Sequence, residues 1–324
     1  MKKEKYTNVS KSSKKVAASH VRAPFGYYGA KVRLASRIVS SLPPHNAWVE
    51  VFCGSAALTV AKQAAPIEVI NDLDDEVVNV FQQLRENSEA LCRAIALTPY
   101  ARSEFLVARG SERPSDPLER ARRFLVATMM TVNGTYGSTG AGFSFSNSYT
   151  RGGKEARVNR GKEARVNRWY NLPERLARVI ERLRNVRIEN RDARELLDMF
   201  SNRPATLLYL DPPYFVRRQH KYVIEADDES FHKELIEKCL RSRCMIFISG
   251  YDNALYHSLL VQKGGWIRET IQTKTRDTSG RDYDRTEILW KNPLFMKALR
   301  TGRVPIRLSA KERKLNKINP SRRR

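Results

Sequence analysis

The sequence predicts an α/β fold in which a doubly wound, mostly parallel sheet carries an inserted, mainly helical module. Three observations support this prediction. Short apolar runs rich in β-branched residues end in acidic or glycine-containing turns, amphipathic helical patterns separate these runs, and the alternation breaks once, between residues 87 and 172. Continuous apolar runs of this length are typical of strands buried in a parallel sheet. Strands that alternate with helices indicate βαβ units.

The predicted elements follow one another in a regular order along the chain. Strands are expected at 48–52, 67–70, 186–188, 207–210 and 245–248, and helices at 31–41, 56–64, 75–86, 173–183 and 230–240. Near the C-terminus, residues 266–273 and 286–290 flank a polar segment at 276–284. Two strand patterns around a polar turn predict a hairpin that closes the sheet.

The break in the alternation predicts a separate module over residues 87–172. Helical patterns at 89–96, 103–109 and 117–130 lead there into segment 131–150, which is rich in Gly, Ser, Thr and Asn and too polar for a core. The module ends in a tandem repeat, because the octapeptide GKEARVNR occurs at 153–160 and again at 161–168. Two copies are too few for a solenoid. They favour a local duplication in a tolerant surface loop over a functional extension.

The charge of the chain points to a polyanionic partner. The sequence has 59 Lys and Arg against 35 acidic residues, a formal net charge of +24. Residues 1–22 contribute +6 and residues 297–324 contribute +10, so the rest of the chain keeps +8. We expect these two ends to be disordered basic tails with diffuse affinity for phosphates. Solubilising or address-bearing tails would have the same composition.

Cysteine, histidine and hydropathy patterns exclude several protein classes. The four cysteines, at 53, 92, 239 and 244, form no CxxC pair, and the five histidines show no metal-ligand spacing. The sequence therefore predicts neither a metal site nor a disulfide framework. The N-terminus lacks an apolar signal region, and no 18-residue apolar run occurs. These features predict a soluble protein in a reducing, intracellular compartment.

The segment Asp211-Pro212-Pro213-Tyr214 carries the strongest chemical signal. It directly follows the apolar run at 207–210, which places it at the carboxyl end of a parallel strand, where open α/β sheets bind ligands. The Asp211 carboxylate and the Pro212 carbonyl could accept both hydrogens of an exocyclic amine and aim its lone pair outward. Two prolines stiffen that carbonyl, and Tyr214 offers a ring on which a base can stack. A Pro-Pro turn with a capping aspartate is the structural alternative.

Two further elements fit a nucleotide-like ligand. A strand pattern runs into a tight turn of small residues around Gly54 and then into a helix, which lets a ligand approach backbone N–H groups. The next strand ends at Asp72, whose carboxylate is placed to bind ribose hydroxyls. No GxGxxG pattern is present. Residues 52–56 therefore suit S-adenosylmethionine better than a dinucleotide, since no pyrophosphate has to be accommodated.

In this order, the motifs resemble those of the Dam-type (class alpha) DNA adenine-N6 methyltransferases, especially the shorter versions found in phages and prophages. The resemblance spans about residues 24–291. The matching segments are 25–31, 49–57, 71–72, 188–192, 211–214, 248–251 and 285–290. Two positions depart from the family pattern, Ala30 and Ala56, where relatives have glycine. Alanine is tolerated there only if φ is negative.

The resemblance implies a set of roles for residues of this chain. The implied fold is the methyltransferase (Rossmann-like) variant of the doubly wound sheet, with an antiparallel last strand. S-adenosylmethionine would be the cofactor, and no metal would be needed. The catalytic residues would be Asp211, Pro212 and Tyr214, and the cofactor-binding residues would be Tyr27, Lys31, Phe52, Gly54, Asp72, Asp192 and Asp211. The catalytic domain would comprise 23–86 and 173–296, and 87–172 would be the target-recognition domain.

The implied function is site-specific transfer of a methyl group from S-adenosylmethionine to N6 of adenine in double-stranded DNA, with the target base flipped out of the duplex. Such an enzyme would be cytoplasmic and bacterial or phage-encoded, and a cognate restriction endonuclease could act separately. Two alternatives stay open at the level of sequence. One is an RNA adenine-N6 methyltransferase, and the other is a non-catalytic DNA-binding homologue.

Overall fold

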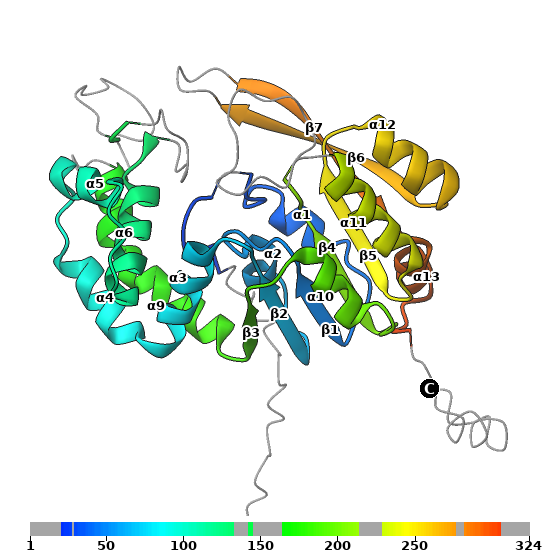
Figure 1. Ribbon diagram of the computed structural model, residues 1–324, viewed down its shortest axis with the longest axis horizontal. Helices are drawn as coiled ribbons and strands as arrows, with labels where there is room; N and C mark the ends of the chain where they lie inside the picture. The colour runs from blue at the N-terminus through cyan, green and yellow to red at the C-terminus, as the bar shows by residue number, and fades with distance from the viewer. Residues whose placement is uncertain are drawn as a thin grey trace, which may run out of the picture.

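The protein is built around one seven-stranded sheet. A computed structural model describes residues 21–27, 29–132, 142–144, 164–213, 229–276 and 282–305. The strands are β1 (Ala47–Glu50), β2 (Ile67–Asn71), β3 (Val186–Glu189), β4 (Thr206–Leu210), β5 (Met245–Gly250), β6 (Ile267–Arg276) and β7 (Asp282–Lys291). They lie in the order β3-β2-β1-β4-β5-β7-β6 (Figure 1). Strands β1 to β5 are parallel, and β7 runs antiparallel to both β5 and β6. The predicted α/β fold with a mostly parallel sheet and an antiparallel closing hairpin is confirmed.

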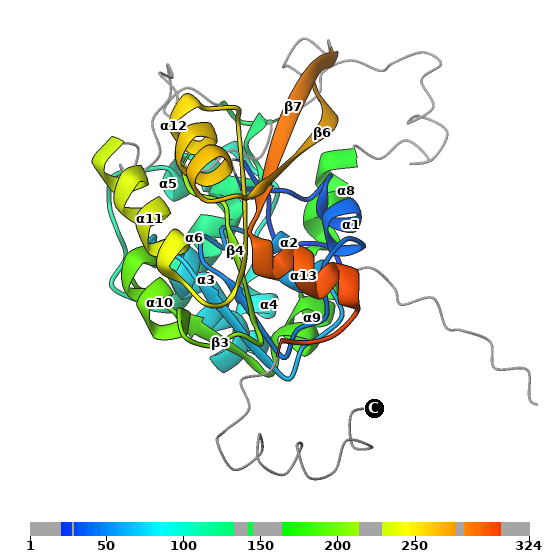
Figure 2. The ribbon, with the colours of Figure 1, turned by 90° about the vertical axis from the view of Figure 1, so that its right-hand side faces the viewer.

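Helices cover both faces of the sheet and one of its ends. They are α1 (Ala35–Val39), α2 (Ala57–Ala61), α3 (Asp75–Glu86), α4 (Ser88–Leu97), α5 (Arg102–Ala108), α6 (Pro117–Met129), α8 (Ala164–Tyr170), α9 (Leu172–Leu183), α10 (Ala193–Phe200), α11 (Glu229–Arg241), α12 (Ala254–Tyr256), the π-helix η2 (His257–Lys263) and α13 (Pro293–Thr301). Figure 2 shows α10 and α11 on one side of the sheet and α1 and α13 on the other. Helix α10 was not predicted from the sequence.

The alternation of side chains along the strands divides the core between the two faces. Val49, Leu208 and Ile246 pack with α10, α11 and η2 on one face. Trp48 precedes Val49 in the sequence, and Tyr209 follows Leu208. Their side chains point to the other face and pack with α1 and α13. Because successive side chains in a strand point to opposite faces, a strand buried on both sides has to be apolar throughout. This requirement explains the continuous apolar runs in the sequence.

The strand order places a topological switch point between β1 and β4. Strands β2 and β3 extend the sheet from β1, whereas β5, β7 and β6 extend it from β4. The connections that leave β1 and β4 therefore diverge, and a crevice is expected between them at the carboxyl ends of the strands.

The predicted module packs on the β3 end of the sheet and shares a core with it. The predicted helices at 89–96, 103–109 and 117–130 are present as α4, α5 and α6. Leu91 and Leu125, from the module, belong to the same buried cluster as Ala57 and Ile70, from α2 and β2. The two parts are therefore continuous in their packing. The segments 133–141 and 145–163, which hold most of the octapeptide repeat, lie outside the described residues.

The predicted start of the C-terminal tail, at residue 297, is wrong for its first five residues. They belong to α13, and Ala298 is buried against the sheet. The helix has a side-chain cap, since Asn292 Oδ1 accepts the Phe295 N–H at 2.8 Å, and Pro293 occupies its first turn. Gly302, at φ +61°, ends it. The capping residue Asn292 and the terminating residue Gly302 thus define a helix in a segment whose basic composition had indicated a tail.

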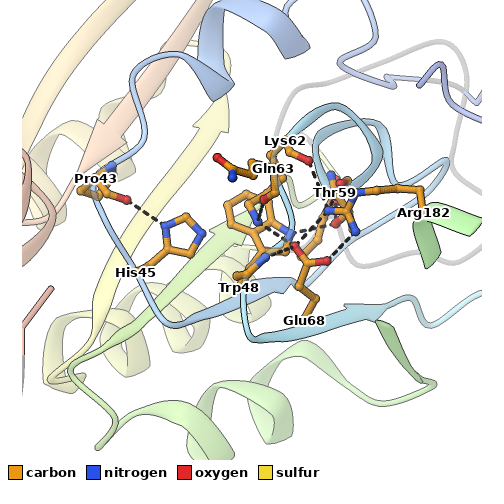
Figure 3. A network of polar contacts seen from close by, with 10 residues as sticks. Pro43, His45, Trp48, Thr59, Lys62, Gln63, Glu68 and Arg182 are labelled. Carbon is orange, nitrogen blue, oxygen red and sulfur yellow. Dashed lines mark hydrogen bonds and ion pairs between the residues drawn. The ribbon is translucent and has the colours of Figure 1, made fainter. Parts of the chain in front are cut away.

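A buried ion-pair network joins α2, β2 and α9 (Figure 3). The Glu68 carboxylate accepts Lys62 Nζ at 2.7 Å and Arg182 Nη1 at 2.6 Å, and the Glu68 and Lys62 side chains are at most 4% exposed. The guanidinium also donates to the Thr59 carbonyl at 2.6 Å. The Thr59 hydroxyl in turn accepts Trp48 Nε1 at 2.7 Å. Charges removed from water in this way stabilise a fold only if every partner stays in place.

Candidate active site

Three of the predicted site residues stand at the carboxyl ends of adjacent strands. Gly54 follows β1, Asp72 follows β2 and Asp211 follows β4. Since β1 lies between β2 and β4, the three converge on the switch-point edge of the sheet. The sequence predicted that each of these residues follows a strand, and the strand order brings the three strand ends together.

Asp211 is held by a buried lysine. Lys31 Nζ lies 2.8 Å from Asp211 Oδ1 and 2.7 Å from Oδ2. The same ammonium donates to the Gly29 carbonyl at 3.0 Å and lies 3.5 Å from Glu287 Oε1. The Lys31 side chain is only 5% exposed, whereas that of Asp211 is 16% exposed. The carboxylate is thus fixed by a buried cation and keeps one side open.

A hydroxyl chain orients the same carboxylate from the other side. Ser249 Oγ donates to Asp211 Oδ1 at 2.8 Å, and it lies 2.8 Å from the Tyr209 hydroxyl. A carboxylate can only accept, so the serine must donate to Asp211 and accept from the tyrosine. Burial raises the pKa of Tyr209 well above its usual range, which keeps this hydroxyl protonated. The contact between Ser249 and Asp211 was not predicted from the sequence, although the place of Ser249 near the end of β5, next to β4, was an available signal.

Asp72 closes the small-residue turn after β1. Its Oδ2 accepts the Gly54 N–H at 2.7 Å, and its Oδ1 accepts the Asp74 N–H at 3.1 Å. Burial raises the pKa of Asp72 to about 6, and hydrogen bonds from the backbone N–H groups of Asp74, Gly54 and Leu73 oppose that rise. The group is therefore mostly ionised at pH 7. A carboxylate has about four acceptor positions, so at least one remains for a hydroxyl donor.

The turn itself is shaped by two residues with positive φ. Gly54 has φ +46°, and a Cβ atom there would lie 2.9 Å from Cδ1 of Tyr27, so the tyrosine ring covers the turn. Ala56 adopts φ +51° and ψ +38°, the one non-glycine residue with positive φ in the part of the chain described. A left-handed alanine costs about 1–2 kcal/mol. The departure at Ala56 is thus strained, whereas Ala30 does not have positive φ.

The remaining predicted residues lie further apart. Asp192 caps α10 after β3, accepts the Arg194 N–H at 2.7 Å and pairs with the Arg194 guanidinium at 2.8 Å. Hydrogen bonds from Arg194 lower the pKa of Asp192. The Phe52 ring packs edge-on against Phe231, 6.5 Å between centroids. Among the described residues, no hydrogen bond or ion pair joins Asp192 to Asp72 or Asp211.

Two of the predicted catalytic residues adjoin Asp211. Pro212 is buried, which fixes the carbonyl that follows the carboxylate. Tyr214 lies outside the described residues. Within the described ranges no group of three or more His, Cys, Asp or Glu side chains could hold a metal ion, and no helix is long and apolar enough to cross a membrane.

Residues 27–275, more than half of the chain, match the model of the D12 class N6 adenine-specific DNA methyltransferases. The chain belongs to this family. It is therefore an enzyme that methylates N6 of adenine in DNA and requires a methyl donor. The family match includes every predicted site residue from Tyr27 to Asp211.

Other comparisons give more distant likenesses. No curated protein sequence matches the chain. A precorrin 8w decarboxylase from Methanobacterium thermoautotrophicum is 9% identical, with a TM-score of 0.34, 81% of this chain covered and 89% of the other. The Escherichia coli protein yhhF, named as a methyltransferase, is 12% identical, with a TM-score of 0.31, 81% of this chain covered and 84% of the other.

Proposed function

We propose that this D12 class enzyme uses S-adenosylmethionine as its methyl donor and methylates an adenine flipped out of double-stranded DNA into the crevice between β1 and β4. The observation that carries the proposal is the Asp211 carboxylate, fixed by Lys31 and Ser249 yet partly exposed at the switch point of the sheet. Bound S-adenosylmethionine supplies a methyl group already activated on a sulfonium.

The turn after β1 fits the proposed cofactor. Asp72 keeps at least one acceptor position free for a ribose hydroxyl, and Gly54 has no side chain, which lets the Tyr27 ring lie directly against the turn. The Ser55 hydroxyl is buried in this turn and has no hydrogen-bond partner among the described residues. A buried polar group without a partner is costly, and a polar ligand would satisfy it. We assign Asp192, Phe52 and Tyr27 to the rest of this pocket.

Asp211 fits the task of orienting an amino group. Lys31 occupies one acceptor position on each carboxylate oxygen, and Ser249 occupies a second position on Oδ1. This leaves one position on Oδ2 for an N–H of adenine. With the Pro212 carbonyl taking the other N–H, the nitrogen lone pair points away from both acceptors. Preorganised acceptors of this kind lower the barrier without reorganisation. We assign Tyr214 to stacking on the base.

The test is methyl transfer from labelled S-adenosylmethionine to duplex DNA, with the methylated base identified after digestion. Asp211→Ala should reduce the rate by about 10²–10³-fold, the loss typical of a preorganised electrostatic group. Asp198→Ala is the matched control, because it removes an aspartate that pairs with Lys238 on exposed α10 surface. Full activity in Asp211→Ala would overturn the proposed mechanism.

The choice of nucleic acid is tested in the same assay. We assign residues 87–172 to target recognition, since they are inserted between β2 and β3 and since Leu91 and Leu125 share a buried cluster with Cys53 and Ala56 of the turn after β1. Duplex DNA and structured RNA compete for transfer in one reaction. Preferential methylation of the RNA would overturn the assignment of duplex DNA as the substrate.

A further inference from the structure

The side chain of Asn71 joins the ends of three strands. Asn71 is the last residue of β2, which lies between β1 and β3 in the sheet, and it is buried. Its Nδ2 donates to the Val51 carbonyl at 2.9 Å and to the Arg191 carbonyl at 3.0 Å. Its Oδ1 accepts the Arg191 N–H at 2.9 Å. The orientation of the amide is unambiguous, because Nδ2 faces two carbonyls and Oδ1 faces an N–H group.

The amide connects these strands past the point where their regular pairing ends. The parallel pairing of β1 with β2 ends at Glu50 and Ile70, and that of β2 with β3 ends at Asn71 and Glu189. The backbone groups that the Asn71 side chain contacts lie one residue beyond β1 and two residues beyond β3. Backbone groups at such places require a partner when they are removed from water. Asn71 therefore extends the connection between the strands into the loops of the candidate site.

Each contact of the Asn71 side chain adjoins a residue of the proposed cofactor pocket. The Val51 carbonyl belongs to the peptide group that leads into Phe52, and the Arg191 carbonyl belongs to the peptide group that leads into Asp192. Because Asn71 contacts both the N–H and the carbonyl of Arg191, it fixes the backbone that carries Asp192.

Backbone contacts complete the same frame around the turn after β1. The Asn71 carbonyl accepts the Cys53 N–H at 2.8 Å, and the Gly54 N–H that follows is held by the Asp72 carboxylate at 2.7 Å. From the β3 side, Asn190 Nδ2 donates to the Asp72 carbonyl at 3.0 Å. Asp72 and the Gly54 turn are thus tied to the loop after β3.

Asn292 makes a comparable set of contacts at the opposite edge of the sheet. Its Nδ2 donates to the Cys244 carbonyl at 2.8 Å, and its Oδ1 accepts the N–H groups of Ile246, at 3.1 Å, and Phe295, at 2.8 Å. It is buried as well, and it lies at the amino end of β5. Each of the two asparagines therefore makes three hydrogen bonds to the backbone, but only those of Asn71 lie at the candidate site.

We propose that Asn71 is a positioning residue for S-adenosylmethionine, which holds the Gly54 turn, the Asp72 carboxylate and the Asp192 loop in the geometry that the adenosyl group requires. This inference rests on the proposed function, because it takes S-adenosylmethionine as the methyl donor. Binding groups that are held by a surrounding shell of hydrogen bonds do not have to be ordered when the ligand arrives. The donor and its product, S-adenosylhomocysteine, share the adenosyl group, so Asn71 affects the binding of both. It does not affect the transfer step, for which Asp211 is held by other residues.

The test measures the dissociation constants of S-adenosylmethionine and S-adenosylhomocysteine by calorimetric titration, and kcat on plasmid DNA at saturating cofactor. Asn71→Ala should raise both dissociation constants about tenfold, because the binding groups are no longer held in place. Its kcat should be unchanged, as expected when the lost binding is the same in the ground state and the transition state. The matched control is Asn292→Ala. It should lose stability in urea denaturation as Asn71→Ala does, since it also loses three buried hydrogen bonds, and it should leave both dissociation constants unchanged.

A second variant keeps the test decisive if Asn71→Ala does not fold. Asn190→Ala changes an exposed side chain and removes its hydrogen bonds to the Asp72 and Leu73 carbonyls, so it should raise both dissociation constants about threefold. Wild-type constants in Asn190→Ala or in folded Asn71→Ala, or an equal rise in Asn292→Ala, would overturn the positioning role while the proposed function stands. If the wild type does not bind S-adenosylmethionine, the proposed function fails and the positioning role fails with it.

Discussion

Replacing Glu50 with Gln should change how the stability of the fold depends on pH. Glu50 is the last residue of β1 and its side chain is buried, and its Oε2 accepts both the N–H of Thr59, at 2.9 Å, and the Thr59 hydroxyl. Burial, with a smaller contribution from the charge of Asp211, raises the pKa of Glu50 from 4.5 to about 7. The folded protein therefore holds a proton on Glu50 over a pH range in which the unfolded chain has released it.

The sign and the size of the effect follow from this difference. Since the folded state binds more protons than the unfolded state between pH 4.5 and 7, the free energy of unfolding of the wild type falls as pH rises through this window. The difference between a pKa of 4.5 and one of about 7 corresponds to about 3 kcal/mol. Glu50→Gln removes the titration. Its stability relative to the wild type should increase by about 3 kcal/mol between pH 4.5 and pH 8.

The assay is urea denaturation of both proteins at several pH values, followed by circular dichroism. Other groups titrate in both proteins, so their contributions cancel in the difference. A constant offset is expected as well, because the new amide N–H₂ would face the Leu58 N–H, which donates to the carboxylate in the wild type. Glu86→Gln, on the exposed surface of α3, is the matched control. A difference that stays flat from pH 4.5 to pH 8 would refute the argument from burial.

Three further substitutions test other features. In calorimetric titration, Gly54→Ala should weaken S-adenosylmethionine binding more than tenfold, because φ is +46° and the new Cβ would lie 2.9 Å from the Tyr27 ring. The control for backbone strain is Gly265→Ala, since Gly265 has φ +65° and no atom lies within 4 Å of a Cβ built there. Glu68→Gln should destabilise the fold by about 3 kcal/mol in urea denaturation, since it leaves two buried cations without their anion; a loss below about 1 kcal/mol would contradict this. Ser249→Ala should lower kcat about tenfold and leave KM for DNA unchanged in steady-state assays, and unaltered kcat would show that the hydroxyl has no positioning role.

The sequence predicted the sheet well because burial on both faces leaves a clear signal. All five continuous apolar runs became parallel strands, and the hairpin appeared where two strand patterns flank a polar turn. Helix α10 was missed although Ala193, Leu196, Leu197 and Phe200 have the spacing of a buried helix face. The helix predicted over 31–41 begins only at Ala35, and Lys31, which precedes it, forms an ion pair with Asp211.

The candidate site was predicted only in part, since sequence patterns show where strands end but not which side chains meet. Asp211, Gly54 and Asp72 were predicted from strand ends. The direct contact between Lys31 and Asp211 spans 180 positions in the chain, and the contact between Ser249 and Asp211 spans 38. No periodic pattern encodes such contacts. The strain at Ala56 likewise depends on a backbone angle that its neighbours impose.

The packing of helices α4 to α6 has a consequence for how the proposed target-recognition module could change its target. Leu91 and Leu125 belong to the same apolar cluster as Ala57, which lies in the helix that follows the Gly54 turn. Residues 87–172 therefore cannot be exchanged as an independent unit, because removing them would expose the apolar side chains of the cluster that they share with the sheet. Chimaeras that receive the whole insert should misfold unless α3 and α9 are transferred together with it. New target preferences should therefore arise more readily by exchanging surface residues while the helices are kept.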